Sequence, residues 1–370
     1  MIPVNTPLLD GKEKEYLIKA IEDGWISSEG PAVKEFEAKF AKTVNRKHGI
    51  SVCNGSIALD LAVYALGISA GDEVIMPSFT IISPAAAVVR VGAKPILVDS
   101  CADTWNMDIS QIEKKITKNT KAILVVHIYG LPVDMKPVLE LAKKHNLKVI
   151  EDAAEMHGQT HGDSPCGSFG DISIFSFYPN KHITTGEGGM IVCNDDALAE
   201  RCRSLRNLAF VPERRFVHYE LGWNYRFTNL QALLGLAQLE RLDEFVAKKR
   251  AMGELYSRLL ADLRDKIELP LDHTDYADNI YWVFGIVLKP AAGINAVEAM
   301  RRLGAEGIGT RPFFYPMHLQ PVFNQMGWYT DEKYPVAENM AEYGFYVPSG
   351  LALTESEIKE VAEKLHKILA

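Results

Sequence analysis

One lysine in this chain stands where a reactive amine would be useful. Lys181 follows an apolar run at residues 172–176 and precedes a glycine-rich turn at residues 186–189. An apolar strand end removes water from such an amine, which lowers its pKa and favours its attack on a carbonyl. Most lysines are solvated surface residues, so this interpretation depends on what the neighbouring segments supply.

A carboxylate is expected close to this lysine. The β-branched run at residues 148–151 continues into Asp152 at the carboxyl end of a predicted parallel strand, where ligands bind. A pyridoxal phosphate (PLP) site requires a lysine for the aldehyde and a carboxylate that keeps the pyridine nitrogen protonated. Lys181 and Asp152 supply these two groups.

The phosphate of such a cofactor needs a cradle of backbone N–H groups and hydroxyls. The candidate is the turn Asn54-Gly55-Ser56, where a short apolar run meets a helix start with Ser56 as its expected cap. Phe79 follows another predicted strand and could stack on a planar ring, although a core role is the more ordinary interpretation of a lone phenylalanine. The three segments, in this order, predict a PLP site.

The elements that would position these groups alternate between strand and helix. Such alternation predicts right-handed crossovers and a mainly parallel sheet in an α/β fold. The expected strands lie at residues 73–76, 95–99, 122–127, 148–151, 172–176 and 190–193, and the expected helices at 12–22, 32–43, 83–91, 110–116, 135–145 and 195–206.

A long helical pattern at residues 229–264 exceeds the usual helix length and is expected to join two domains. A coiled coil is the alternative, but the heptad is not sustained. We therefore expect a large cofactor-binding domain at residues 1–240, including the N-terminal segment, and a smaller C-terminal α/β domain at residues 241–370. The smaller domain is expected to hold strands at 281–288 and 308–311 and helices at 296–303 and 355–369.

Composition argues against several classes of protein. The 370 residues are 47% hydrophobic and 24% charged, which is typical of a soluble globular chain. The net charge of −8 argues against a nucleic-acid partner, so local arginines must pair with any anionic substrate. Five scattered cysteines without a C-x-x-C spacing predict neither a metal site nor disulfides, and fit a cytoplasmic location. No apolar run approaches the ~20 residues that span a bilayer, so no membrane association is expected.

The order of these segments resembles the DegT-type family of sugar-nucleotide aminotransferases, and the resemblance extends along the whole chain. It is carried by Gly24-Trp25-Ile26-Ser27-Ser28-Glu29-Gly30, Asn54-Gly55-Ser56, Gly71-Asp72-Glu73-Val74-Ile75, Glu151-Asp152-Ala153-Ala154-Glu155, residues 181–189, Asn224-Tyr225-Arg226, Arg311-Pro312 and Pro316-Met317-His318.

The resemblance implies the aspartate aminotransferase fold (PLP fold type I), with a large domain built on a mainly parallel sheet and a smaller C-terminal α/β domain. It implies that L-glutamate donates its amino group, through PLP and pyridoxamine phosphate (PMP), to the keto carbon of a nucleotide-linked 4-keto-6-deoxy sugar. Lys181 would hold the aldehyde and shuttle protons, and Asp152 would stabilise the pyridinium. The cofactor-binding residues carried over are Ser56, Ile57, Phe79, Asp152, Ala154, Glu155, Ser176, Lys181 and Asn224.

Asn224 would reach the phosphate of the other subunit, so the resemblance implies a homodimer with shared active sites, in a cytoplasmic pathway leading to the O-antigen of lipopolysaccharide. The substrate-binding residues carried over are Trp25, Ser27, Arg226, Arg311, Tyr315 and His318. Two departures from the family pattern bear on the choice of sugar. Tyr178-Pro179 precedes Asn180-Lys181, and Ser56 stands where the family often has threonine.

Three alternatives differ in class. A nucleotide-binding dehydrogenase fits poorly, because the glycine-rich turn lacks the G-x-G-x-x-G spacing. Some relatives are PLP-dependent sugar 3-dehydratases with histidine in place of the lysine, and His182, directly after Lys181, keeps that alternative open. A non-enzymatic PLP-binding regulator is disfavoured because both Lys181 and Asp152 are present.

Overall fold

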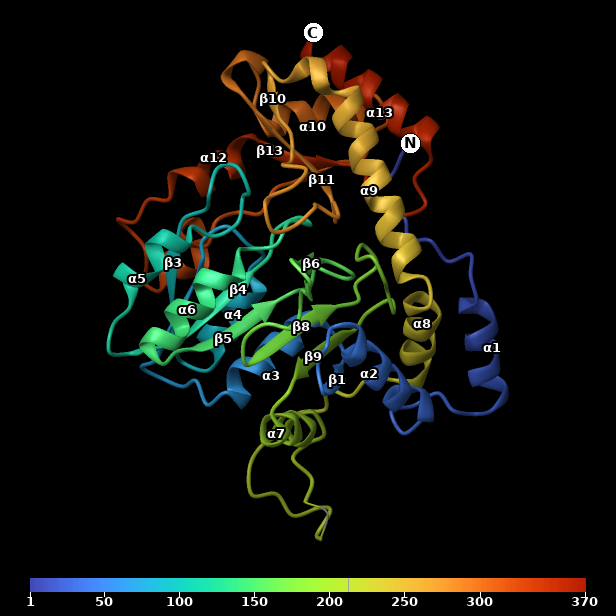
Figure 1. The fold of residues 1–370 in the computed structure, drawn as a ribbon, viewed down its shortest axis with the longest axis vertical. Coiled ribbons are helices and arrows are strands. Elements are labelled where there is room, and N and C mark those ends of the chain that lie inside the picture. Colours follow the sequence, from blue (N-terminus) through green and yellow to red (C-terminus); the bar gives the residue numbers. More distant parts are fainter. Residues whose placement is uncertain (212) are drawn as a thin grey trace.

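The computed structural model describes residues 1–211 and 213–370, and its larger sheet has seven strands in the order β1-β9-β8-β5-β4-β2-β3 (Figure 1). Five neighbouring strands, from β3 to β8, run parallel, and β9 runs antiparallel to both β8 and β1. The strands are β1 (His48–Val52), β2 (Glu73–Pro77), β3 (Lys94–Val98), β4 (Thr120–Val126), β5 (Lys148–Asp152), β8 (Ile172–Ser176) and β9 (Gly189–Cys193). The expected mainly parallel α/β sheet is confirmed.

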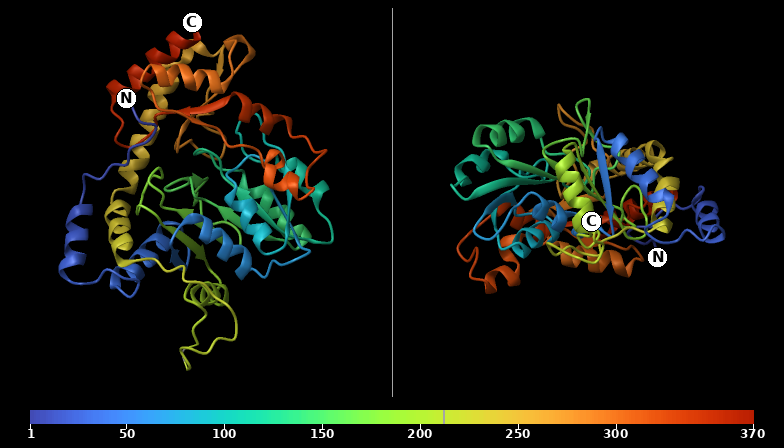
Figure 2. Two further views of the ribbon diagram at one scale, coloured as in Figure 1. Left: turned by 180° about the vertical axis from the view of Figure 1, so that it is seen from behind. Right: turned by 90° about the horizontal axis from the view of Figure 1, so that it is seen from below.

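Helices lie on both sides of this sheet (Figure 2). In β4, Ile123 and Val125 pack with Met135 of α6 (Met135–His145) on one face. Leu124 belongs to a second core with Leu61 of α3 (Gly55–Ala65) on the other face. Because both faces are covered, the central strands are apolar throughout rather than alternating. The other helices of this part are α1 (Glu13–Glu22), α2 (Pro31–Thr43), α4 (Ser83–Arg90), α5 (Ile112–Lys115) and α7 (Asp196–Arg206).

The long helix expected at residues 229–264 is two helices, α8 (Asn229–Leu239) and α9 (Leu242–Leu259), separated by a turn at Glu240 and Arg241. The turn is held by charged contacts with the N-terminal segment. Tyr16 donates to Glu240 over 2.6 Å, and Arg241 forms an ion pair with Asp10 and another with Glu244 of the first turn of α9. Apolar periodicity continues through the turn, which is why the sequence pattern concealed it.

The smaller sheet is antiparallel, with the order β10-β11-β13-β12. Its strands are β10 (Ile267–Glu268), β11 (Phe284–Leu288), β12 (Arg311–Pro312) and β13 (Gly344–Val347), and α10 (Ala296–Ala305) and α13 (Glu355–Leu369) pack against it around a separate apolar core. The strand expected at 281–288 begins only at Phe284, because Tyr281 takes a positive φ of 47° that ends the extended backbone. A hairpin of β6 (Thr160–His161) and β7 (Ser164–Pro165) completes the sheets of the described residues.

Two segments connect the halves of the chain. At the N-terminus, Ile2 pairs with Ile308, and the N–H of Ser349 donates to the carbonyl of Val4. From the larger sheet, Asp99, directly after β3, accepts hydrogen bonds from the N–H groups of Val336 and Ala337 in the first turn of α12 (Pro335–Tyr343). Helix α12 follows α11 (Pro321–Gln325). The division at residue 240 stays a prediction.

No described helix is long and apolar enough to cross a membrane, and the five cysteines are free thiols.

Candidate active site

Lys181 and Asp152 are positioned by two adjacent parallel strands. Asp152 is the last residue of β5, and its register partner on β8 is Ile174, so both strands end at the same edge of the sheet. After β8 the chain folds back on itself, with the Thr185 N–H donating to the carbonyl of Phe177 and the Lys181 N–H to that of Tyr178. This turn brings Lys181 back over the strand ends, as the sequence analysis expected.

The Lys181 amine is enclosed by a carboxylate and an aromatic ring. Its Nζ lies 3.8 Å from Glu155 Oε1 and 3.8 Å from the centre of the Trp282 ring, and the side chain is one-tenth exposed. Burial lowers the pKa of Lys181, against the opposing effects of the Glu155 and Asp152 carboxylates. The amine is therefore easier to deprotonate than an exposed lysine, which is what nucleophilic attack on an aldehyde requires.

Asp152 is a buried carboxylate with little local compensation. Its side chain accepts one hydrogen bond, from the Ala154 N–H over 3.1 Å. Burial raises the pKa of Asp152 to about 6, opposed by the Ala154 N–H and by the Lys181 amine. A protonated pyridine nitrogen would supply the cation that this carboxylate needs, so the residue fits its predicted role.

Glu155 connects this pair to the aromatic side chains around it. It accepts a hydrogen bond of 2.7 Å from the N–H of Tyr129, a residue with a positive φ of 59°. Burial raises the pKa of Glu155 to about 8, and the Lys181 amine acts in the opposite direction. The cleft therefore holds two carboxyl groups whose proton affinities are raised beside one amine whose proton affinity is lowered, the kind of arrangement found at sites of proton transfer.

The predicted phosphate cradle lies at the start of α3, but the residue that caps the helix differs from the expected one. Asn54, rather than Ser56, caps α3, because its side chain accepts from the Ile57 N–H over 2.9 Å. Ser56 is left to bond the Ser83 hydroxyl over 2.8 Å, and the first-turn N–H groups of a helix have no carbonyl within it to bind. Gly55 lies against Ser176 so closely that a Cβ would stand 2.7 Å from the Ser176 Cβ. The turn, β8 and the helix N-terminus thus converge, which suits a phosphate.

Two buried polar atoms of the described residues support the fit to a cofactor. The side-chain oxygens of Asn180, next to Lys181, and of Thr80, next to Phe79, have no hydrogen-bond partner. Buried polar groups are normally paired, so unpaired ones at the ends of β2 and β8 point to a polar molecule that binds there. PLP carries a lysine-reactive aldehyde, a ring nitrogen and a phosphate, and the residues of this cleft match all three.

Aromatic side chains surround Lys181 and Glu155, and several of them were missed by sequence analysis. Phe79 is fully buried, and its ring centre lies 6.0 Å from Tyr129 and 5.8 Å from Phe314. Trp282 and Tyr346 come from the second half of the chain, where no motif marks them. Burial raises the pKa of Tyr346 to about 12, with the Glu155 carboxylate adding to the effect. Stacking of Phe79 on the cofactor stays a prediction.

The predicted substrate residues fall into several places. Arg311 is exposed and pairs in register with Tyr346, which places it near the cleft, and Tyr315 is half-exposed in the following loop. His318 is buried, with Nδ1 2.8 Å from the Ser78 hydroxyl and Nε2 3.0 Å from Glu338, so both ring nitrogens are occupied. The exposed residues Trp25 and Ser27 lie in the loop between α1 and α2.

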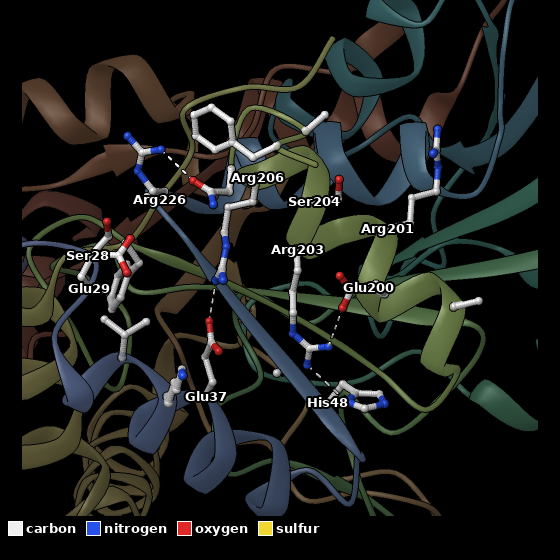
Figure 3. Close-up of a pocket in the computed structure, with 18 of the residues that line it drawn as sticks. Ser28, Glu29, Glu37, His48, Glu200, Arg201, Arg203, Ser204, Arg206 and Arg226 are labelled. Atoms are coloured by element: carbon white, nitrogen blue, oxygen red, sulfur yellow. Dashed lines mark hydrogen bonds and ion pairs between the residues drawn. The ribbon is translucent and has the colours of Figure 1, made fainter. Parts of the chain in front are cut away.

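Arg226 and the exposed Asn224 directly follow residues 207–211 and 213–223, part of which projects from the body of the molecule (Figure 1). Arg226 donates to Asn207 over 2.7 Å in the wall of a groove of about 1090 Å³ (Figure 3). The groove also contains the ion pairs Arg206–Glu37 and Arg203–Glu200. Lys181, Asp152 and Ser56 are not among its lining residues.

A histidine, a glutamate and a cysteine behind the cleft lie close enough to hold a metal ion, but their hydrogen bonds give them another role. His127 Nδ1 accepts from the Val133 N–H, and Nε2 lies 3.1 Å from Glu151. Glu151 also accepts from the Gly167 and Phe169 N–H groups. This network fixes the position of Glu151 and so of the end of β5. It engages both ring nitrogens of His127, so we assign this residue no catalytic role.

The sheet, the buried lysine and the carboxylate at the strand ends define a PLP-dependent enzyme of fold type I. Solved structures agree. The aminotransferase TlmJ from Streptoalloteichus hindustanus superposes with a TM-score of 0.92 at 29% identity, covering 100% of this chain and 99% of that one. DesV of S. venezuelae superposes with a TM-score of 0.89 at 33% identity, covering 97% and 94%.

Sequence comparison gives the family. Residues 7–366 match the model of the DegT/DnrJ/EryC1/StrS aminotransferase family. GDP-perosamine synthases of Escherichia coli O157:H7 and of Caulobacter vibrioides are 42% and 43% identical, and each alignment covers at least 98% of both chains. The chain belongs to the DegT/DnrJ/EryC1/StrS aminotransferase family, and it is a PLP-dependent sugar aminotransferase.

Proposed function

We propose that this enzyme transfers the amino group of L-glutamate to the keto carbon of GDP-4-keto-6-deoxymannose and so forms GDP-perosamine. The observation that carries the chemistry is the Lys181 amine, enclosed next to Asp152 and Glu155 at one edge of the sheet. The identity of the sugar is supported by relatives named GDP-perosamine synthase, which match at 38% to 43% identity over nearly the whole chain. By the same resemblance, the product enters O-antigen synthesis in the cytoplasm.

The residues of the chain have separate tasks in this reaction. When bound, PLP supplies the electron sink for bond breaking at the carbon that carries nitrogen. Lys181 Nζ takes up a proton at one stage of the reaction and gives it back at a later stage. The lowered pKa of Lys181 favours the release of this proton. Asp152 holds positive charge at the ring nitrogen, and the α3 N-terminus with Ser56 and Ser176 binds the phosphate. The aromatic wall of Phe79, Tyr129 and Trp282 excludes water.

The proposal includes a homodimer in which Asn224 completes the partner's site. Support comes from the projecting segment. Phe216, Tyr219 and Leu221 on it are 82%, 79% and 85% exposed, and a second copy would bury them. Asn224 itself is exposed where this segment rejoins the body. The groove at its base would then belong to the interface.

The test is to offer the purified enzyme GDP-, dTDP- and UDP-linked 4-keto-6-deoxy sugars with L-glutamate and to identify each product by mass and NMR. GDP-perosamine from the GDP-sugar alone is the expected result. Amination of only a dTDP- or UDP-sugar would retain the aminotransferase and overturn the choice of sugar. A deoxygenated product would identify a sugar 3-dehydratase. We consider the dehydratase less suitable, because His182 is fully buried and its Nε2 lies 3.4 Å from the carbonyl of Ile280.

A further inference from the structure

We propose that Trp282 is a positioning residue for Lys181: its indole ring holds the lysine amine through a cation–π contact and so keeps the amine aimed into the cleft while it carries a proton. The inference rests on the proposed role of Lys181. It concerns a residue from the second half of the chain for which the sequence offered no functional sign. The distance of 3.8 Å from Nζ to the ring centre is well within the range in which such contacts are favourable.

The Trp282 ring is fixed from several sides. Its Nε1–H donates to the carbonyl of Asn180 over 2.7 Å, which ties the ring to the turn that carries Lys181. Its own carbonyl accepts from the buried Lys249 amine over 2.7 Å. Tyr129 packs on it with ring centres 5.8 Å apart, and only 3% of the residue is exposed. A ring held in this way keeps its place when the lysine changes its protonation or its bonding.

The charged and titratable groups around the amine show what the ring adds. Glu155 lies 3.8 Å away on one side, and Asp152 acts on the amine from the strand end. The Lys181 charge also acts on two buried histidines, His157 and His182, whose pKa values are lowered by burial. Burial also raises the proton affinity of Glu155, so the amine faces a carboxyl group that is partly protonated near neutral pH. The Trp282 ring stabilises the cation without being able to take its proton.

This property matters at one stage of the reaction cycle. The Lys181 amine is unlinked whenever the amino group resides on the cofactor, and it then has to hold a proton and deliver it to the correct atom. An ammonium group held only by carboxylates can lose its proton to them. A cation–π contact stabilises the ammonium form without accepting its proton, and it limits the rotamers of a long, flexible side chain.

The test measures the pKa of the Lys181 amine directly. The full-length enzyme is loaded with PMP, labelled with trace acetic anhydride at a series of pH values, and the extent of acetylation of the Lys181 peptide is read by mass spectrometry. The variants are Trp282→Phe, which retains a weaker ring, and Trp282→Leu, which retains none. Trp328→Leu is the matched control, because the Trp328 ring also lies over a lysine, at 5.8 Å from Lys94 Nζ, but outside the cleft.

We expect the pKa of the Lys181 amine to fall by about one unit in Trp282→Leu and by less in Trp282→Phe, because the lost contact stabilised the cation. The control should leave it unchanged. An unchanged pKa in Trp282→Leu, or an equal fall in Trp328→Leu, would overturn the inference. If Trp282→Leu fails to fold, Trp282→Phe decides alone: a lowered pKa supports the contact, and an unchanged one refutes it.

A separate measurement keeps this result apart from the proposed role of Lys181. Borohydride reduction of the PLP-loaded wild-type enzyme, followed by peptide mapping, should attach the cofactor to Lys181. Attachment to another lysine would refute that role, and the inference with it. Attachment to Lys181 together with an unshifted pKa in the variants would refute the inference alone.

Discussion

The most demanding prediction concerns Lys249, a lysine buried without a carboxylate. Its side chain is 2% exposed, and its Nζ donates to the carbonyls of Trp282 and Ser349. These bonds join the chain just before β11 to the chain just after β13 in the smaller sheet. Burial lowers the pKa of Lys249 to about 7, whereas an unfolded chain has the ordinary value of 10.5. The folded protein therefore binds this proton less tightly than the unfolded chain does.

The sign and size of the effect on stability follow from this difference. Below pH 7 both states are protonated, and the folded state bears the full cost of the buried charge. Between pH 7 and 10.5 the folded state has released the proton while the unfolded state retains it, so the free energy of unfolding rises with pH. From pH 6 to pH 9 the rise due to Lys249 is roughly 2.5 kcal/mol, out of roughly 5 kcal/mol for the complete shift.

The assay compares wild type with Lys249→Met by urea unfolding at pH 6, 7.5 and 9. Because all other titrating groups are common to both proteins, the difference between the two free energies of unfolding isolates Lys249. Between pH 6 and pH 9 the free energy of unfolding of wild type should rise by roughly 2.5 kcal/mol relative to that of the variant. The exposed neighbour Lys248 provides the control, since Lys248→Met should show no such trend. A difference that stays constant with pH would show that Lys249 titrates normally and that the burial argument is wrong.

Three further predictions concern the active site. Asp152→Asn should leave the fold intact but slow turnover at least ~100-fold, because an amide cannot hold the pyridinium proton, and a near wild-type rate would refute that role. Arg311→Ala should raise the KM for the nucleotide sugar and leave the half-reaction with L-glutamate, followed by cofactor absorbance, unchanged; equal damage to both would assign Arg311 to the glutamate carboxylate. Mixing inactive Lys181→Ala with weakened Asn224→Ala should restore activity through heterodimers that have one intact site, whereas a monomer in analytical ultracentrifugation would refute the shared site.

The first half of the chain could be predicted from its sequence because the relevant signals are local. Parallel strands buried on both faces are continuous apolar runs, and their carboxyl ends lie at one edge, so Asp152 and Lys181 could be paired without a structure. The helix after Asn54 was also visible, although the cap was assigned to the wrong residue. Asn and Ser are both good caps, and the choice depends on backbone geometry at a single residue.

The second half was less predictable, because its contributions to the site come from contacts distant in sequence. Trp282 reaches Lys181 only because Tyr281 takes a positive φ, which turns the chain just before β11. His318 was assigned to substrate on the basis of its loop, yet Ser78 and Glu338 occupy both of its nitrogens. The signal in each case is a partner far along the chain, and periodicity within a short window carries no information about such a partner.

The two lysines show how burial can serve different ends in one protein. Lys181 and Lys249 are both buried, and burial lowers the pKa of both. Lys249 faces two fixed carbonyls, which accept its hydrogen bonds in either protonation state, so its proton affinity affects stability alone. Lys181 faces two carboxyl groups, which can accept its proton, and an aromatic ring, which cannot. Because Trp282 contacts both amines, through its ring and its carbonyl, loss of Lys249 should also loosen the ring over Lys181. Lys249→Met should therefore lower the pKa of the Lys181 amine in the same direction as Trp282→Leu, and an unaltered Lys181 pKa in Lys249→Met would show that the ring is held by Asn180 and Tyr129 without it.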